Sequence, residues 1–126
     1  LKIQKKFLDK NKSFDLVGSN AIYIDKKFKF IKKTNLLLHS VKIKDSIYFR
    51  NPLIHSTVFA RKNFFLRNPY NPKFRKCQDY ELWIRTADKY KFKNLKIPLI
   101  ERYDAKNFNF DSLFYSIFSR LYNFKI

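Results

Sequence analysis

The sequence is poor in glycine, cysteine and methionine, and each shortage excludes a class of site. Gly18 is the only glycine among 126 residues, so neither common type of glycine-rich phosphate loop can be built. Cys77 is the only cysteine, which excludes an internal disulfide framework, and no set of Cys and His residues has zinc-site spacing. Because methionine is absent and residue 1 is leucine, we expect the sequence to be a piece of a longer chain.

Long apolar runs and acidic residues are also scarce. No apolar run approaches the ~20 residues that span a bilayer, and residues 1 to 6 lack the apolar core of a secretion signal, so we expect a cytoplasmic protein. Ten acidic residues stand against 28 basic ones, and the net charge of +18 favours anionic partners such as nucleic acid, lipid or phosphorylated molecules. A solvated lysine surface, produced by the codon bias of an A/T-rich genome, explains the charge equally well.

Hydrophobic residues make up 45% of the chain and aromatic residues 19%, enough for one compact core. Their spacing predicts a helix over residues 1 to 8 and a buried strand over 14 to 19. Residues 21 to 24 and 28 to 31 flank a polar segment, which predicts a hairpin although the usual turn glycine is missing.

The second half alternates in the same way. The predicted elements are a helix or irregular crossover at 41 to 49, a strand at 53 to 60, a short helix at 61 to 66, a helix at 79 to 89, and a strand at 92 to 97 and 99 to 100 that is stopped or kinked at Pro98. Glu81 and Arg85 are expected to pair on the helix surface. Residues 110 to 122 predict an amphipathic helix that begins near Asp111 or Ser112. This alternation predicts the α/β class.

The strongest local signal lies at residues 78 to 83, which read Gln-Asp-Tyr-Glu-Leu-Trp. It places Asp79 at the start of an amphipathic helix in a protein with few acidic residues. A carboxylate at a helix N-terminus is stabilised in its ionised form, and can therefore accept a proton as a general base. The competing interpretation is an ordinary first-turn aspartate that only stabilises the helix.

Taken together, these segments resemble the C-terminal part of a family 2, GT-A type glycosyltransferase domain. The likeness begins with the helix at Leu1 and the strand at 14 to 19, which resemble the segment after that family's Asp-x-Asp motif. It continues through Asn-Pro-x-x-His-x-Thr-Val-x-x-Arg-Lys at 51 to 62, is strongest at 78 to 83, and fades after about Asp104. The resemblance implies a mixed sheet with flanking helices. We expect a partial transferase domain over 1 to 105 and a C-terminal amphipathic helix over 106 to 126.

The resemblance also implies a reaction and a set of residues. Such enzymes invert a sugar: an acceptor hydroxyl attacks the anomeric carbon of a nucleotide sugar, a carboxylate removes its proton, and a divalent metal, Mg or Mn, supports the departing diphosphate. Asp79 matches the position of the base. Its neighbour Gln78 and the motif residues His55, Arg61 and Trp83 match positions that can bind substrate, although packing is an alternative for His55, Arg61 and Trp83. Cys77 is expected to be a bystander.

Some departures from the family pattern limit what the chain can do. The metal-holding aspartate pair and the nucleotide-binding half would precede Leu1, so we predict no metal ligands here. Asn68 and Pro69 stand where a glycine pair is frequent, and Ser56 replaces a common proline. We therefore expect the 126 residues alone not to transfer sugar, and the whole protein to act on a glycan or lipid-linked acceptor in cell-surface glycan biosynthesis.

Two other classes compete with this interpretation. Lysines interleaved with phenylalanine and tyrosine could bind single-stranded nucleic acid, but no RNA-binding signature or basic recognition helix is present. The helix at 110 to 124, with Arg120 and Lys125, could instead lie on an anionic membrane, at the inner face of the cytoplasmic membrane. The alternative for that helix is packing against the rest of its own domain.

Overall fold

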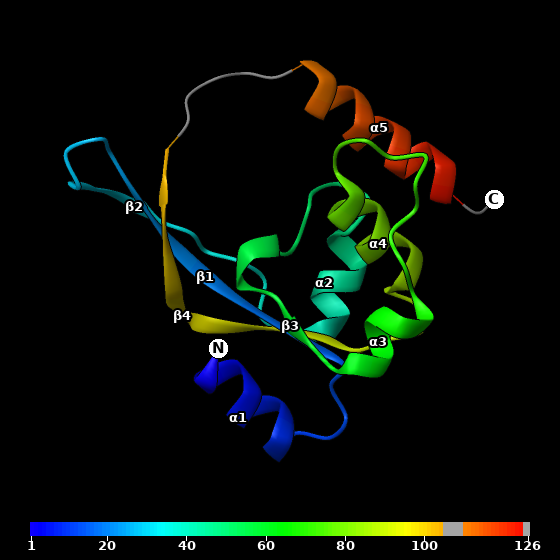
Figure 1. Ribbon diagram of the computed structural model, residues 1–126, viewed down its shortest axis with the longest axis horizontal. Helices are drawn as coiled ribbons and strands as arrows, with labels where there is room; N and C mark the ends of the chain where they lie inside the picture. Colours follow the sequence, from blue (N-terminus) through cyan, green and yellow to red (C-terminus); the bar gives the residue numbers. More distant parts are fainter. Residues whose placement is uncertain (105–109, 125–126) are drawn as a thin grey trace.

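A computed structural model describes residues 1–104 and 110–124 and confirms the α/β class, with a mixed four-stranded sheet and flanking helices (Figure 1). The elements are α1 (Lys2–Lys10), β1 (Leu16–Ile24), β2 (Phe30–Lys33), α2 (Ser40–Ser46), a 3₁₀ helix η1 (His55–Thr57), β3 (Phe59–Ala60), α3 (Lys62–Arg67), α4 (Gln78–Thr86), β4 (Phe92–Tyr103) and α5 (Phe110–Asn123). Helices α2 and α4 lie on one side of the sheet and α1 on the other (Figure 1).

Strand β1 is the centre of the sheet. Strand β4 pairs with it in parallel along its whole length, while β2 and β3 pair with it antiparallel on the other edge, at opposite ends. Residues Leu16 to Ala21 are all buried, as a strand covered on both faces requires. This continuous strand joins the two shorter strands predicted at 14 to 19 and 21 to 24.

The core lies between the sheet and α4. The apolar stripe predicted for this helix is confirmed, because Tyr80, Leu82, Trp83, Ile84 and Ala87 are all buried. They pack with Leu16, Ile43, Ile47, Leu53, Phe64 and Phe92, contributed by the neighbouring strands, helices and the segment before η1. One aromatic-rich cluster therefore fixes α4 against the sheet, and with it the residues at the start of α4.

The predicted hairpin forms without a turn glycine. The Asp25 carboxylate accepts hydrogen bonds from the backbone N–H groups of Lys27 and Lys29, at 2.7 and 2.9 Å. Phe28 takes the left-handed conformation, with φ 59°, that glycine would normally supply. An aspartate and a strained phenylalanine thus replace the usual turn residues.

Strand β4 runs through Pro98 to Tyr103, so of the two outcomes predicted there the stop is wrong. The strand as a whole is strongly bent (Figure 1). The register with β1 shifts on both sides of Asn20, so Ser19 pairs with Leu95 and Ala21 with Ile100. The Asn20 amide crosses this irregularity and donates to the Lys96 carbonyl oxygen at 2.9 Å. The bend turns the last residues of β4 alongside the hairpin end of β1.

The strand predicted over residues 53 to 60 is wrong for most of its length, since only Phe59–Ala60 is strand and η1 precedes it. The Thr57 hydroxyl donates to the Ile54 carbonyl oxygen at 2.8 Å and accepts from the Ser19 N–H at 2.9 Å. The first bond is local and curls the chain into a turn, and the second ties this turn to β1, so both compete with strand pairing. As a result His55 is exposed instead of ending a buried strand.

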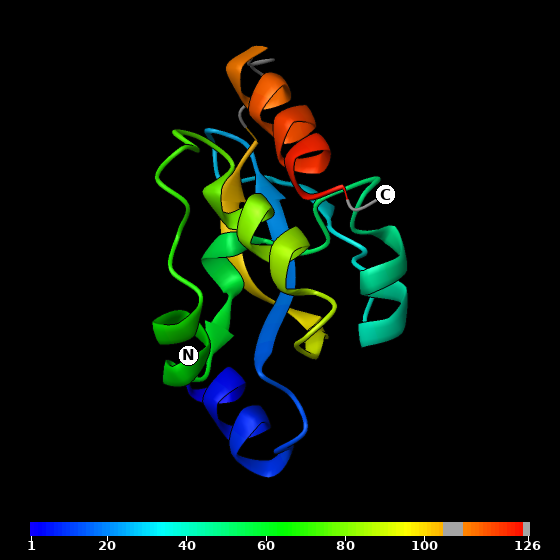
Figure 2. The same ribbon diagram turned by 90° about the vertical axis from the view of Figure 1, so that its right-hand side faces the viewer.

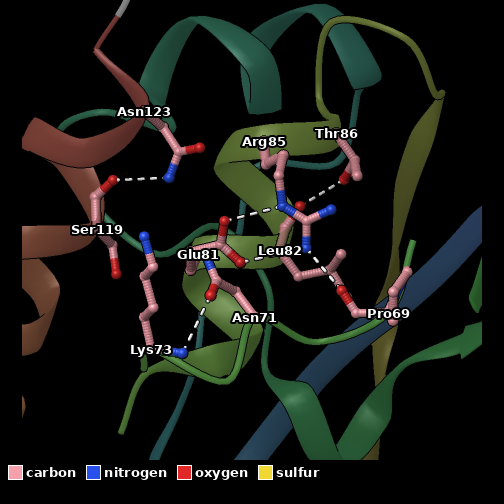
Figure 3. A network of polar contacts seen from close by, with 9 residues as sticks. All are labelled: Pro69, Asn71, Lys73, Glu81, Leu82, Arg85, Thr86, Ser119 and Asn123. Carbon is pink, nitrogen blue, oxygen red and sulfur yellow. Dashed lines mark hydrogen bonds and ion pairs between the residues drawn. The ribbon is translucent and has the colours of Figure 1, made fainter. Parts of the chain in front are cut away.

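The predicted Glu81–Arg85 pair exists, but its placement on the surface is wrong. Glu81 is fully buried, and Arg85 donates to both of its carboxylate oxygens, at 2.8 and 3.2 Å. Arg85 also donates to the Pro69 carbonyl oxygen at 2.8 Å (Figure 3). The hydrogen bond from Arg85 to Pro69 therefore ties α4 to the loop between α3 and α4, and Glu81 holds the arginine in place for it.

The amphipathic C-terminal helix is confirmed as α5, which packs on α4 and on the loop before it. The Phe74 and Phe118 rings stack with 5.0 Å between centroids, and Arg120 donates to the Tyr80 hydroxyl at 3.1 Å. Asp111 and Ser112 lie in its first turn. The division of the chain at residue 105 lies outside the described residues and stays a prediction.

Gly18→Ala is expected to destabilise the fold by about 2 kcal/mol, an ordinary cost of overpacking. An added Cβ would lie 2.6 Å from Asn94 Oδ1. That amide cannot move away easily, because its nitrogen donates to the Leu37 and Pro52 carbonyl oxygens at 2.8 and 2.9 Å. Urea unfolding measures the loss. The same substitution in an Asn94→Ala background should cost less, and an equal cost in both backgrounds would contradict this explanation.

Candidate functional site

A cleft of about 660 Å³ opens where β1, β4, the start of α4 and the segment before η1 meet. Its lining residues are Tyr23, Asn51, Leu53, Ile54, His55, Ser56, Asp79 and Arg102. Two residues of the predicted site, His55 and Asp79, therefore lie in one cleft although they are far apart in the sequence. The two strongest segments of the family resemblance meet here.

Asp79 is the second residue of α4 and is half-buried. Asn51 donates from its amide nitrogen to Asp79 Oδ2 at 3.4 Å, while its amide oxygen accepts from the Leu53 N–H at 3.2 Å. Asn51 is thereby held in one orientation beside the carboxylate. Because Asp79 lines the cleft, its carboxylate can accept a proton from a molecule bound there.

His55 is exposed and is supported from two sides. Its Nε2 lies 3.3 Å from the Tyr70 hydroxyl, and its ring meets the Trp83 ring edge to face with 6.4 Å between centroids. Burial, and to a lesser degree the charge of Asp79, raise the pKa of Tyr70. Tyr70 therefore keeps its proton at neutral pH and can donate it to His55 Nε2, which leaves Nδ1 as the ring's other polar atom.

Sequence reasoning missed the opposite wall of the cleft, which Tyr23 and Arg102 form. These residues are partners in the parallel pairing of β1 and β4, and the Arg102 guanidinium lies 5.9 Å from the Tyr23 ring centroid. On the neighbouring strand, Lys32 Nζ lies 5.1 Å from the same centroid. The register of β4 decides this arrangement, and no motif in the sequence reports it.

The other predicted site residues lie away from the cleft. Trp83 is fully buried, so packing is the role that its position favours over a sugar platform. Arg61 donates to the carbonyl oxygens of Phe14 and Leu8, at 3.0 and 2.7 Å, and closes the turn between α1 and β1. Gln78 is exposed as the first residue of α4 and is not among the residues that line the cleft.

Cys77, the residue before α4, has the chemistry of a bystander. It adopts a left-handed conformation with φ 56°, and its thiol donates to the Ser112 carbonyl oxygen at 3.4 Å. Burial raises the pKa of this thiol, and the nearby Asp79 charge raises it further. A thiol that keeps its proton at neutral pH is a poor nucleophile.

The described part of the chain contains no group of three or more His, Cys, Asp or Glu side chains that could hold a metal ion. Among the helices that the structure describes, none has the length and apolar character needed to cross a bilayer.

Comparison with known proteins gives one informative likeness. No protein-family model matches the chain. Over 94 residues, 73% of this chain, the sequence is 28% identical to an uncharacterized glycosyltransferase of Methanocaldococcus jannaschii. The matched region amounts to 32% of that protein, so the chain spans about a third of the relative's length. The chain is thus similar to part of a glycosyltransferase, and this likeness supports a relationship to such enzymes.

Proposed function

We propose that the cleft is the acceptor side of a GT-A type, family 2 glycosyltransferase site and that Asp79 is its general base. The observation that carries the proposal is the meeting of Asp79 with His55 and Asn51 in one cleft. These three residues come from the two motifs on which the resemblance depends. The likeness to part of a glycosyltransferase adds support.

The chemistry that this arrangement favours is a single displacement with inversion. An acceptor hydroxyl in the cleft gives its proton to Asp79 as its oxygen forms a bond to the anomeric carbon of a nucleotide sugar. The bond from that carbon to the diphosphate oxygen breaks at the same time, and the electron pair leaves with the diphosphate. Asn51 keeps the carboxylate oriented toward the acceptor.

The polar residues around Asp79 would position the acceptor. His55 is held by Tyr70 and Trp83, so its free ring nitrogen can hydrogen-bond a second hydroxyl of the acceptor. Arg102 faces the cleft from β4 and can hold an anionic or polar group on the same molecule. The chemical class that this set fits is a glycan or a lipid-linked sugar.

The divalent metal and the nucleotide sugar would be held mainly by other residues. The described residues do not fit a metal site, because they lack a cluster of suitable ligands. We therefore propose that the residues that bind the metal and the donor come from outside the 126 residues. The pathway we propose for the whole protein is cell-surface glycan synthesis.

The test is release of nucleoside diphosphate from nucleotide sugars by the polypeptide that its own cells make, with a membrane fraction of those cells as the acceptor source. We expect release from at least one nucleotide sugar, and we expect it to require the acceptor fraction. The 126 residues alone should give no turnover. Absence of release from every common nucleotide sugar would contradict the proposed activity, and turnover by the 126 residues would contradict the need for further donor-binding residues.

A further inference from the structure

The hairpin of β1 and β2 exposes large apolar side chains that the fold leaves uncovered. Phe28 is 73% exposed and Phe30 is 65% exposed, and all four residues of β2 face solvent. Tyr103, at the end of β4, lies beside the hairpin tip, with 5.9 Å between its ring centroid and that of Phe28. Figure 1 shows the hairpin extending beyond the body of the molecule. Exposed apolar groups gathered in this way mark an interaction surface.

Lysines alternate with these apolar side chains. Lys26, Lys27, Lys29, Lys32 and Lys33 are all exposed on the hairpin. They outnumber the acidic residues on and beside it, which are Asp25, Glu101 and Asp104. Lysines on an edge strand can serve simply to prevent pairing with another chain. That role does not explain phenylalanines exposed among them, because exposed aromatic rings promote association.

The conformation of Phe28 also calls for an explanation. A φ of 59° is costly for a bulky residue, and glycine or asparagine would take it with less strain. The strain is not offset by burial, since the ring is largely in solvent. Strained residues are concentrated at functional sites, so the conformation of Phe28 supports an interaction at this loop tip.

A second apolar surface lies on α5. Figure 1 draws the hairpin and α5 at the left and right of the long axis, and both views place α1 below them (Figures 1 and 2). Although α5 packs on α4, several of its apolar residues stay exposed: Leu113, Phe114, Ile117, Leu121 and the following Phe124. The molecule therefore carries two separate apolar surfaces, and the one on the hairpin is rich in lysine.

We infer that the hairpin docks on an anionic lipid bilayer, with Phe28 and Phe30 entering the headgroup boundary and the lysines contacting anionic headgroups. Apolar side chains interleaved with lysines fit such a surface on both counts. A second copy of this chain would bring two strongly positive surfaces together, which charge repulsion disfavours. Single-stranded nucleic acid is the less suited polyanion, because Ile31 is exposed beside the hairpin rings, and an aliphatic side chain gains by burial in lipid but offers no face on which a base can stack.

Docking through the hairpin would hold the cleft close to the bilayer. Tyr23 lines the cleft and pairs with Lys32 of β2, so the base of the hairpin is one wall of the cleft. Docking itself does not depend on the proposed function. If the cleft transfers sugar as proposed, docking of the hairpin favours an acceptor carried by the membrane. This preference for a membrane-bound acceptor rests on the proposed function.

The experiment is sedimentation with vesicles of phosphatidylcholine alone and of phosphatidylcholine with about one third phosphatidylglycerol. We expect the full chain to bind the anionic vesicles and to be released by salt. Phe28→Gly with Phe30→Ser should weaken binding at least about tenfold, because two apolar anchors are lost. Lys26→Ser with Lys27→Ser should weaken it about 25-fold, as each basic residue near an anionic surface contributes about a factor of five.

Matched controls lie on α1 and α3, away from the hairpin (Figure 1). Leu66→Ser removes an exposed apolar residue from α3, and Lys10→Ser with Lys12→Ser removes two exposed lysines near the end of α1. Neither should change vesicle binding, and thermal melting should show that Phe28→Gly folds normally, because glycine accepts the φ of this position. Equal losses in control and hairpin variants would overturn the inference.

Two further outcomes would also overturn it. One is binding that α5 carries alone, so that Leu113→Ser with Phe114→Ser removes it while the hairpin variants keep it. The other is the absence of vesicle binding together with salt-sensitive binding of a mixed-sequence single-stranded oligonucleotide, which would assign the hairpin to nucleic acid. Neither result bears on diphosphate release, so failure of docking is distinguishable from failure of the proposed activity.

Discussion

Asp79→Asn is expected to lower sugar transfer by about 10²- to 10⁴-fold, the usual contribution of a general base. Asparagine keeps the size of the side chain and can still contact Asn51, but it cannot take a proton from an acceptor hydroxyl. Because substrate contacts are preserved, the loss should appear in kcat, with KM for the acceptor nearly unchanged. The measurement is nucleoside diphosphate release by the polypeptide from its own cells, with the substitution at the equivalent gene position.

Two comparisons separate a base from a helix-stabilising aspartate. Asp45→Asn removes an exposed carboxylate from α2, away from the cleft, and should leave turnover unchanged. Thermal melting should show that Asp79→Asn costs at most about 1 kcal/mol, the usual value of a charge near a helix N-terminus. Turnover within a few-fold of the unsubstituted protein would show that Asp79 only stabilises α4, and the proposed role would then be wrong.

The sequence predicted the wall of the cleft that contains Asp79 and His55, but not the wall formed by Tyr23 and Arg102. Asp79 and His55 each belong to a contiguous motif, and local periodicity places Asp79 at the start of α4. Tyr23 and Arg102 come together because β4 pairs in parallel with β1 after two register shifts. Strand pairing between distant segments is a property of the packed sheet, so a single sequence contains no local signal for it.

The two corrected predictions have a common physical cause. Residues 53 to 60 have strand-like composition, yet the bonds of the Thr57 hydroxyl favour a turn that exposes His55. Glu81 was expected at the surface because charged residues are seldom buried, but tertiary contacts cover it once α4 packs. In both cases contacts from distant parts of the chain override the local preference. The first of them brings a site residue to the cleft.

Arg85→Met is expected to destabilise the protein by about 3–5 kcal/mol, because it leaves a buried carboxylate without its partner. Glu81 is 0% exposed, while the Arg85 side chain is 31% exposed and supplies both hydrogen bonds to that carboxylate. The Pro69 carbonyl oxygen loses a donor in the same variant. Figure 3 shows the arginine between these two acceptors. The free energy of urea unfolding measures the loss.

A matched control and a double variant decide whether the buried charge is the cause. Lys5 and Asp9 form an ion pair with the same spacing on α1, but both side chains are exposed, so Lys5→Met should hardly change stability. Combining Arg85→Met with Glu81→Leu removes both charges and should recover much of the loss, because an apolar pair needs no desolvation of a carboxylate. If the double variant is no more stable than Arg85→Met, the loss comes from the Pro69 contact and from packing of the arginine stem. In that case the buried carboxylate would tolerate isolation, and α4, with Asp79 at its start, would be held in place mainly by its aromatic core.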